Sequence, residues 1–220
     1  MRLTGFGAAP DKRYSLATKI SACATWHEDQ MPARLANVFE TIMYEYAKLI
    51  ADQAVEDRAT LTPAERTTRD YWSFVALTFK KLKDGRISAS PILRENKKLV
   101  QSGGLCAYCG TTGSLQWEHI IPKSRGGPDT IDNMVLSCPK CNREKSARNP
   151  IEWYDSKAVH RKHISRIVMG KLLKVVLEEH RRKSTLEATE FPNGKGLHLF
   201  NVCLVFDDNV NESARSNIDA

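Results

Sequence analysis

Four of the six cysteines form two pairs with the spacing Cys-x2-Cys, Cys106/Cys109 and Cys138/Cys141. Each pair can bind one face of a tetrahedral zinc ion, and four thiolates complete its coordination. Such a closed site stabilises the fold and leaves no open position for a substrate. The spacing therefore predicts a structural Zn²⁺ site, with four buried, metal-free cysteines as the alternative, and any chemistry must come from other residues.

The residues between and just after the two pairs include the side chains that chemistry would need. One of them is His119, and histidine is the side chain type whose unperturbed pKa of about 6.5 suits a general base near neutral pH. Glu118 and Asn142 offer oxygen ligands of the kind that Mg²⁺ or Mn²⁺ prefers. A base and a divalent ion together favour phosphodiester hydrolysis. Because adjacent strand residues face opposite sides, we expect a twisted strand end or a bulge to bring Glu118 and His119 to one site.

The region from Leu105 to Arg148 resembles the HNH endonuclease family. That family has an acidic residue and a histidine at the end of a strand, then a loop with proline and glycine, an asparagine, and a histidine or asparagine on a following helix. The matching residues in this sequence are Glu118-His119, Pro122, Gly126-Gly127, Asn133 and Asn142.

The resemblance implies a ββα-metal core, in which a two-stranded hairpin and a helix hold one divalent ion. It implies that His119 is the general base and that Asn133 steadies it. Glu118 and Asn142 would bind the catalytic Mg²⁺ or Mn²⁺, although many members have the shorter Asp at the position of Glu118. The implied products carry a 5′-phosphate and a 3′-hydroxyl.

The net charge of +7 is concentrated in one part of the chain. The stretch from Cys138 to Lys183 holds 13 Lys and Arg residues against 5 Asp and Glu residues, so the remainder is close to neutral. A local basic surface is typical of a protein that binds a polyanion, with a solvated basic face as the alternative. The basic residues expected to contact nucleic-acid phosphates are Lys123, Arg125, Arg143, Lys145 and Arg148.

Helical patterns dominate the first hundred residues, in which we identify no catalytic residue. Apolar spacing predicts one helix over Met31–Asp57 and a second that follows a capping box at Thr62 and stops at Gly85. A shorter third helix is expected over Ile92–Gln101.

Beyond Leu105 the sequence predicts alternating strands and helices. A helix is expected from Pro139 towards Arg148, with Ser137 as its cap and Asn149-Pro150 as its end. The other expected elements are a strand over Leu115–Ile121, a long basic helix over Ser156–Lys183 and a strand over Leu197–Phe206. The two unpaired cysteines, Cys23 and Cys203, are expected in the core.

These elements predict an α+β, mainly α fold in three parts. Residues 1–102 would form an N-terminal helical accessory region, and residues 103–155 the HNH nuclease core with its zinc knuckles. Residues 156–220 would contribute the long basic helix, a strand and a polar tail.

Our leading hypothesis is a metal-dependent HNH endonuclease that cuts double-stranded DNA, and the alternative is a non-catalytic, zinc-stabilised nucleic-acid-binding module. In a third version, the nuclease is the effector of a phage-defence or restriction system, and its N-terminal helical region docks an ATPase or a sensor. The sequence has no apolar run of about 18 residues, and Met1–Pro10 has no apolar segment typical of a secretory signal. We therefore expect a cytoplasmic protein without a membrane partner.

Overall fold

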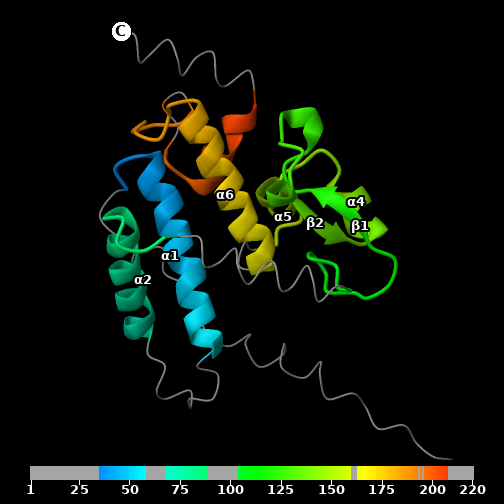
Figure 1. Ribbon diagram of the computed structural model, residues 1–220, viewed down its shortest axis with the longest axis horizontal. Helices are drawn as coiled ribbons and strands as arrows, with labels where there is room; N and C mark the ends of the chain where they lie inside the picture. The colour runs from blue at the N-terminus through cyan, green and yellow to red at the C-terminus, as the bar shows by residue number, and fades with distance from the viewer. Residues whose placement is uncertain are drawn as a thin grey trace, which may run out of the picture. The chain divides into compact units, whose positions relative to one another are not determined.

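The computed structural model describes residues 35–57, 68–88, 104–159, 163–192, 194 and 196–207 (Figure 1). These residues form a helix-rich fold with one small antiparallel sheet and a cluster of four cysteines. The predicted capping box at Thr62, the helix expected over Ile92–Gln101 and Cys23 lie outside the described residues.

The first two helices confirm the amphipathic patterns of the N-terminal region, with different bounds. Helix α1 runs over Val38–Asp57, and α2 over Thr68–Lys83. The start of α1 lies later than predicted because Asn37 caps the helix, its side chain accepting a hydrogen bond from the Glu40 backbone N–H at 2.9 Å. Gly85 follows α2 with a φ of 67°, the left-handed conformation that ends helices at glycine.

The small sheet is a two-stranded antiparallel hairpin made of β1, Gln116–His119, and β2, Met134–Ser137. The predicted strand is therefore present but shorter, and Ile120 and Ile121 lie buried just beyond it. The connection between the strands contains two short 3₁₀ turns, η4 over Lys123–Arg125 and η5 over Ile131–Asn133.

Two short helices follow the hairpin. Helix α4 runs over Pro139–Lys145, and its cap is Cys138, whose sulfur accepts a hydrogen bond from the Cys141 backbone N–H, in place of the predicted Ser137. Asn149-Pro150 does end this helical region, but it also begins α5, Pro150–Ser156, which the sequence reading missed. Asn149 and Glu152 form a reciprocal capping box at its start.

The long basic helix predicted over Ser156–Lys183 is present but begins later, as α6, Arg166–Arg182, and its inward face includes Val168, Leu172 and Val176. The strand predicted over Leu197–Phe206 is wrong, because this stretch forms helix α7, Leu199–Val202, and the 3₁₀ helix η7, Cys203–Phe206. Its buried residues recur at helical spacings of three or four and are Leu199, Val202, Cys203, Val205 and Phe206. A short apolar run does not distinguish a strand from a buried helix by pattern alone.

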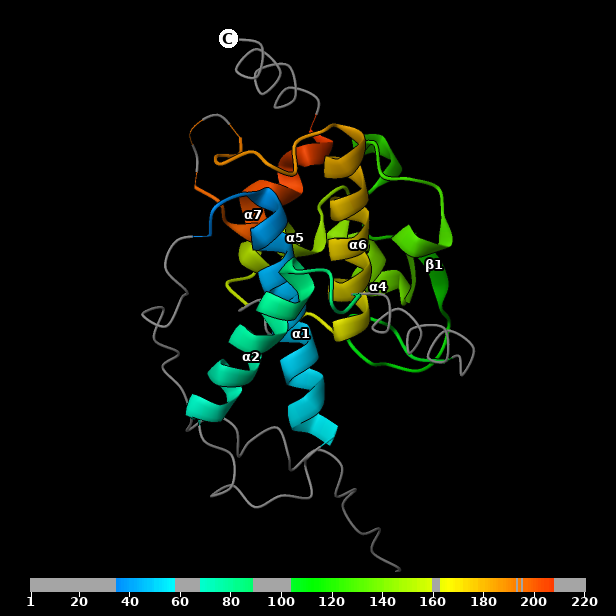
Figure 2. The ribbon, with the colours of Figure 1, turned by 60° about the vertical axis from the view of Figure 1, so that its left-hand side comes forward.

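One hydrophobic core joins helices from the N-terminal and C-terminal parts of the chain. Helix α1 packs against α2, α6 and α7, and it lies beside α6 in both views of the ribbon (Figure 2). Helix α6 also contacts η5, where the buried Lys171 ammonium donates to the backbone carbonyls of Ile131 and Met134. Helix α6 thus packs against the connection between the two strands and holds it in place.

None of the helices in the described part of the chain combines the length and apolar character that a membrane crossing requires.

Candidate nuclease site

The four paired cysteines converge on one point. Their sulfur atoms lie within 4.8 Å of one another, and the Cys109 and Cys138 sulfurs are 3.8 Å apart. Zinc–sulfur bonds of about 2.3 Å in a tetrahedron place the sulfurs about 3.8 Å apart, so the donor set and its geometry fit zinc. The cluster could hold a metal ion that joins the segment before β1 to the start of α4.

Local hydrogen bonds prepare part of this cluster for ionisation. Burial opposes ionisation of the Cys106 thiol, but hydrogen bonds from the backbone of Cys138, Cys109 and Tyr108 outweigh it and lower the pKa to about 6. Burial raises the pKa of Cys141 and of Cys109. Zinc binds thiolates, so the lowered pKa of Cys106 favours the form that an ion would bind.

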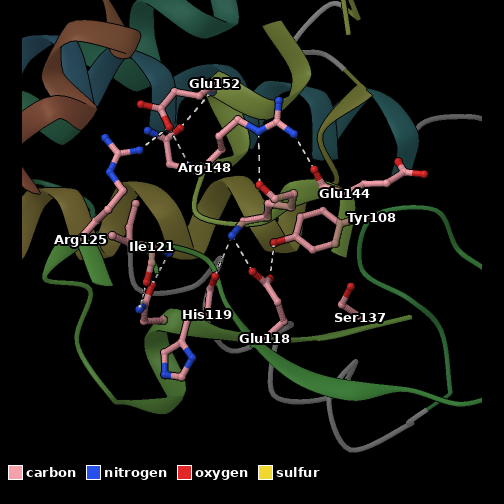
Figure 3. A network of polar contacts seen from close by, with 12 residues as sticks. Tyr108, Glu118, His119, Ile121, Arg125, Ser137, Glu144, Arg148 and Glu152 are labelled. Atoms are coloured by element: carbon pink, nitrogen blue, oxygen red, sulfur yellow. Dashed lines mark hydrogen bonds and ion pairs between the residues drawn. The ribbon is translucent and has the colours of Figure 1, made fainter. Parts of the chain in front are cut away.

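Behind β1 lies a buried polar cluster, which we call the inner triad: Tyr108, Glu118 and Lys145. The Tyr108 hydroxyl donates to Glu118 Oε2 at 2.6 Å, and the Lys145 ammonium lies 2.5 Å from Glu118 Oε1 (Figure 3). Lys145 Nζ also donates to the backbone carbonyl of His119 at 2.9 Å. The exposed fractions of Tyr108, Glu118 and Lys145 are 9%, 5% and 0%. The triad therefore closes a charge pair away from solvent and holds the end of β1.

The inner triad also connects the cysteine cluster to the hairpin. Tyr108 lies between Cys106 and Cys109, and Lys145 is the last residue of the helix that contains Cys141. Burial lowers the pKa of Lys145, and the neighbouring Glu118 carboxylate opposes that shift. Burial and the same carboxylate raise the pKa of Tyr108 well above its ordinary value, so its hydroxyl stays a donor.

On the other face of β1 lies an exposed chain of contacts, which we call the outer triad: His119, Asp129 and Lys123. His119 Nε2 lies 2.9 Å from Asp129 Oδ1, and Lys123 Nζ donates to Asp129 Oδ2 at 2.7 Å. The Lys123 contact first and the His119 contact second lower the pKa of Asp129. The exposed fractions of these side chains are 23%, 56% and 59% for His119, Asp129 and Lys123. Solvent and a phosphate can therefore reach this face.

Glu118 and His119 do not meet at one site. The regular register pairs Glu118 with Val135 and His119 with Met134, so the expected bulge is absent and the two side chains take opposite faces. Figure 3 shows the imidazole pointing away from the Glu118 carboxylate. Both Glu118 oxygens are engaged by the inner triad, and the residue is buried. The expected donor pair of Glu118 and Asn142 does not fit a catalytic divalent ion in this structure.

Residues 106–148 match the HNH endonuclease family. The chain carries an HNH endonuclease domain. This chain is 42% identical over 67 residues to the type IV methyl-directed restriction enzyme EcoKMcrA of Escherichia coli (strain K12), a match that covers 24% of each protein. It is 40% identical over 68 residues to the CRISPR-associated endonuclease Cas9 of Actinomyces naeslundii, a match that covers 29% of this chain and 6% of that protein. The chain thus aligns with about a quarter of the first relative and a small part of the second. No solved structure matches the chain significantly.

Asn133 of the HNH domain is fully buried and fastens the loop that carries Asp129. Its amide oxygen accepts from the Ile121 backbone N–H at 2.9 Å, and its Nδ2 donates to the carbonyls of Ile121 and Pro128 at 2.8 and 2.9 Å. A Cβ at Gly127 would lie 1.9 Å from the Ile121 carbonyl oxygen, so only glycine fits this close approach. Asn133 therefore holds the loop around His119 by backbone contacts.

Two expected phosphate contacts of the HNH domain, Lys145 and Arg125, have structural partners instead. Lys145 is fully buried in the inner triad and cannot reach a phosphate. The Arg125 guanidinium pairs with Glu152 and with Asp207, which lies 3.0 Å from its Nε. It therefore links η4 to α5 and to the residue after η7.

Of the three other basic residues expected to contact phosphates, one has structural partners and two are exposed. Arg148 donates to the backbone carbonyls of Glu144 and Lys145 and to Ser156 Oγ, so it closes the end of α4. Arg143 lies exposed on α4, and Lys123 is exposed in the outer triad. These last two stay candidates for phosphate contact.

Sequence reasoning missed Tyr108 and Asp129. Tyr108 could have been noticed as an aromatic residue inside a cysteine pair, where burial is expected. Asp129 lies in a polar loop among turn residues, where an acidic side chain has no distinctive spacing.

Asn142, the expected metal ligand on α4, lies partly buried, and its side chain has no hydrogen-bond partner among the described residues.

Proposed function

We propose that this chain is a metal-dependent HNH endonuclease that hydrolyses phosphodiester bonds in double-stranded DNA, with His119 as the general base. The observation that carries the proposal is the outer triad. It holds a partly exposed imidazole at the end of β1, inside the HNH domain, beside a carboxylate and a lysine. Such a histidine can accept a proton from water near neutral pH.

In the proposed reaction, His119 removes a proton from a water molecule whose oxygen attacks the phosphorus. The bond between phosphorus and the 3′ oxygen breaks, and the leaving alkoxide takes a proton from solvent. The products carry a 5′-phosphate and a 3′-hydroxyl, as the family resemblance implies. Arg143 and Lys123 are exposed and suit contacts to the DNA backbone.

The proposed nuclease uses two kinds of metal ion, one structural and one catalytic. Zn²⁺ in the four-cysteine cluster would be structural, since four thiolates leave no open coordination position. HNH nucleases depend on metals, which supports a requirement for Mg²⁺ or Mn²⁺ to neutralise the phosphate charge. Both Glu118 oxygens accept hydrogen bonds from Tyr108 and Lys145, so we do not propose Glu118 as a ligand of Mg²⁺ or Mn²⁺. Asn142 remains a candidate ligand.

The biological setting we propose is restriction or phage defence in the cytoplasm. This setting is supported by the two relatives, which are described as a methyl-directed restriction enzyme and a CRISPR-associated endonuclease. A protein partner such as an ATPase or a sensor would bind the N-terminal helical region. In the described residues, α1 and α2 belong to the same core as α6, which contacts the hairpin connection, so partner binding there has a physical route to the HNH domain.

A plasmid-nicking assay tests this function. Zinc-loaded protein is incubated with supercoiled plasmid and Mg²⁺ or Mn²⁺, and His119→Ala is expected to lower the rate by about 10²- to 10⁴-fold, the usual contribution of a positioned general base. His163→Ala is the matched control, because His163 is exposed and lies outside the HNH domain. Cutting by His119→Ala at the wild-type rate would remove His119 from the mechanism.

The alternative is a non-catalytic, zinc-stabilised nucleic-acid-binding module. One observation favours it: the Glu118 carboxylate is bound in the inner triad and does not face His119. Tight DNA binding by wild-type protein without hydrolysis in any divalent ion would support this alternative over the nuclease.

A further inference from the structure

We propose that Asp129 is a positioning residue for His119: it accepts a hydrogen bond from Nε2–H and so leaves Nδ1 as the basic nitrogen. The inference rests on the proposed nuclease function, because it names the residue that orients the base. It assigns a role to a carboxylate ten residues beyond His119 that the sequence analysis did not single out.

The contact geometry determines which nitrogen carries the proton. Asp129 Oδ1 lies 2.9 Å from His119 Nε2, and Lys123 Nζ donates to the other oxygen at 2.7 Å. Lys123 and His119 both favour the ionised carboxylate. An ionised carboxylate accepts hydrogen bonds and cannot donate one, so the proton of this contact lies on Nε2. A neutral imidazole with hydrogen on Nε2 has its lone pair on Nδ1.

The loop that carries Asp129 is fixed by the two residues that precede it. Pro128, the preceding residue, accepts a hydrogen bond through its carbonyl from the buried Asn133 side chain. Gly127 fits directly against the Ile121 carbonyl, where a larger residue would collide. The carboxylate is therefore presented to His119 by the folded backbone, although the carboxylate itself is exposed. Exposed ion pairs add little stability, so this contact is better explained by orientation than by holding the fold.

Orientation of this kind matters in both directions of the proton transfer. Before the transfer it selects the tautomer and the ring rotation that present Nδ1. After the transfer, the imidazolium carries a positive charge next to the Asp129 carboxylate, which stabilises it. Among the described residues no hydrogen bond engages Nδ1, so the protein leaves this nitrogen unpaired for the proton transfer.

Nuclear magnetic resonance of the ring nitrogens tests the inference without any measurement of cutting. The full zinc-loaded chain is prepared with isotope-labelled histidine, and the His119 signals are identified among six histidines by their loss in His119→Gln. Wild-type protein is expected to show the Nε2–H tautomer at His119. Asp129→Ala is expected to give a mixture of the two tautomers, and Asp129→Asn, which keeps an acceptor oxygen, to retain more of the Nε2–H form.

Asp132→Ala is the matched control. Asp132 belongs to the same loop and pairs with Lys174 on α6 instead of with His119, so its removal takes away the same charge without touching the imidazole. Its spectrum at His119 should equal that of the wild type. A His119 tautomer that is the same in wild-type and Asp129→Ala proteins would overturn the inference.

Kinetics then separate positioning from substrate binding. Asp129→Ala is expected to lower kcat by about 10- to 100-fold, a part of what a positioned base contributes, with KM for DNA unchanged. A loss confined to KM would overturn the positioning role and make Asp129 a determinant of DNA binding. If wild-type protein cuts no DNA in any divalent ion while Asp129→Ala still shifts the tautomer, the nuclease proposal fails and the orientation of His119 by Asp129 stands.

Discussion

The inner and outer triads contain similar residues but lie in opposite environments, one buried and one exposed. Each contains a carboxylate and a lysine, and the two are attached to consecutive residues of β1, Glu118 and His119. The inner carboxylate is buried with both oxygens bonded inside the protein, whereas the outer carboxylate is more than half exposed. One pleat of a short strand therefore separates a cluster that stabilises the fold from a cluster that water and phosphate can reach.

The two carboxylates are of similar chemical type and differ in burial: Glu118 is buried and Asp129 is exposed. Removal of one partner from a buried charge pair leaves the other charge desolvated and is costly, whereas an exposed pair contributes little to stability. We therefore expect changes in the inner triad to lower stability first, and changes in the outer triad to lower activity with the fold intact.

Loss of zinc should have the largest effect on the inner triad. Structural zinc sites supply about 10–16 kcal/mol of apparent binding free energy, and Tyr108 lies between two of the ligands. Chelation, or Cys138→Ser, is expected to remove the slow hydrogen exchange of β1 and β2 and all cutting. Zinc-free protein, verified by metal analysis, that retained protected amides in the hairpin would contradict this dependence.

Lys145→Met should be the most destabilising single change in the inner triad. It leaves the Glu118 carboxylate buried without its ammonium partner, so we expect the free energy of unfolding to fall by about 3–5 kcal/mol in denaturant titrations. The double variant Lys145→Met with Glu118→Gln should regain part of the loss, since it removes the unpaired charge. Arg143→Met is the control on the same helix, because Arg143 is exposed. An equal loss in both single variants would contradict the role of the buried pair.

Tyr108→Phe should have a smaller effect of the same sign. It removes one hydrogen bond to a charged carboxylate, worth about 1.5–3 kcal/mol, and leaves the aromatic packing in place. The comparison is Tyr154→Phe, whose hydroxyl makes only a 3.4 Å contact with the Tyr108 carbonyl. Thermal melts should rank Tyr108→Phe as the less stable of the two, and the reverse ranking would count against the inner triad.

Lys123→Met should have the smallest effect on stability, since Lys123 is exposed. The melting temperature is expected to stay at the wild-type value, because an ion pair this exposed contributes little to stability. The cutting rate should fall by less than about 10-fold, because the Asp129 contact to His119 remains after its lysine is lost. A clear drop in melting temperature with normal cutting would place Lys123 among the residues that hold the fold.

The parts of the molecule predictable from sequence are those with a distinctive spacing. The two Cys-x2-Cys pairs, a strand within Leu115–Ile121 and the helix that follows Cys138 were all expected, because metal geometry and local patterns specify them. The strand ends at His119, before the predicted end at Ile121. The motif also located the HNH domain correctly.

The parts that could not be predicted depend on which way side chains face and on distant partners. Lys145 and Arg125 have the charge of phosphate ligands, but tertiary packing pairs them with Glu118, Glu152 and Asp207. Glu118 was expected to share one site with His119 through a twisted strand end or a bulge, yet the strand register is regular and separates the two side chains. The C-terminal apolar run was assigned to a strand because its burial by α6 and α1 is not visible in its pattern.

The most direct test of the account compares the single-turnover cutting rates of Glu118→Gln and His119→Gln. Supercoiled plasmid is used with Mg²⁺ or Mn²⁺ at a temperature at which circular dichroism shows both variants folded. We predict that Glu118→Gln, although less stable, cuts within about 10-fold of the wild-type rate, whereas His119→Gln loses about 10²- to 10⁴-fold. A fully folded Glu118→Gln that is as inactive as His119→Gln would contradict the division of labour between the two faces of β1.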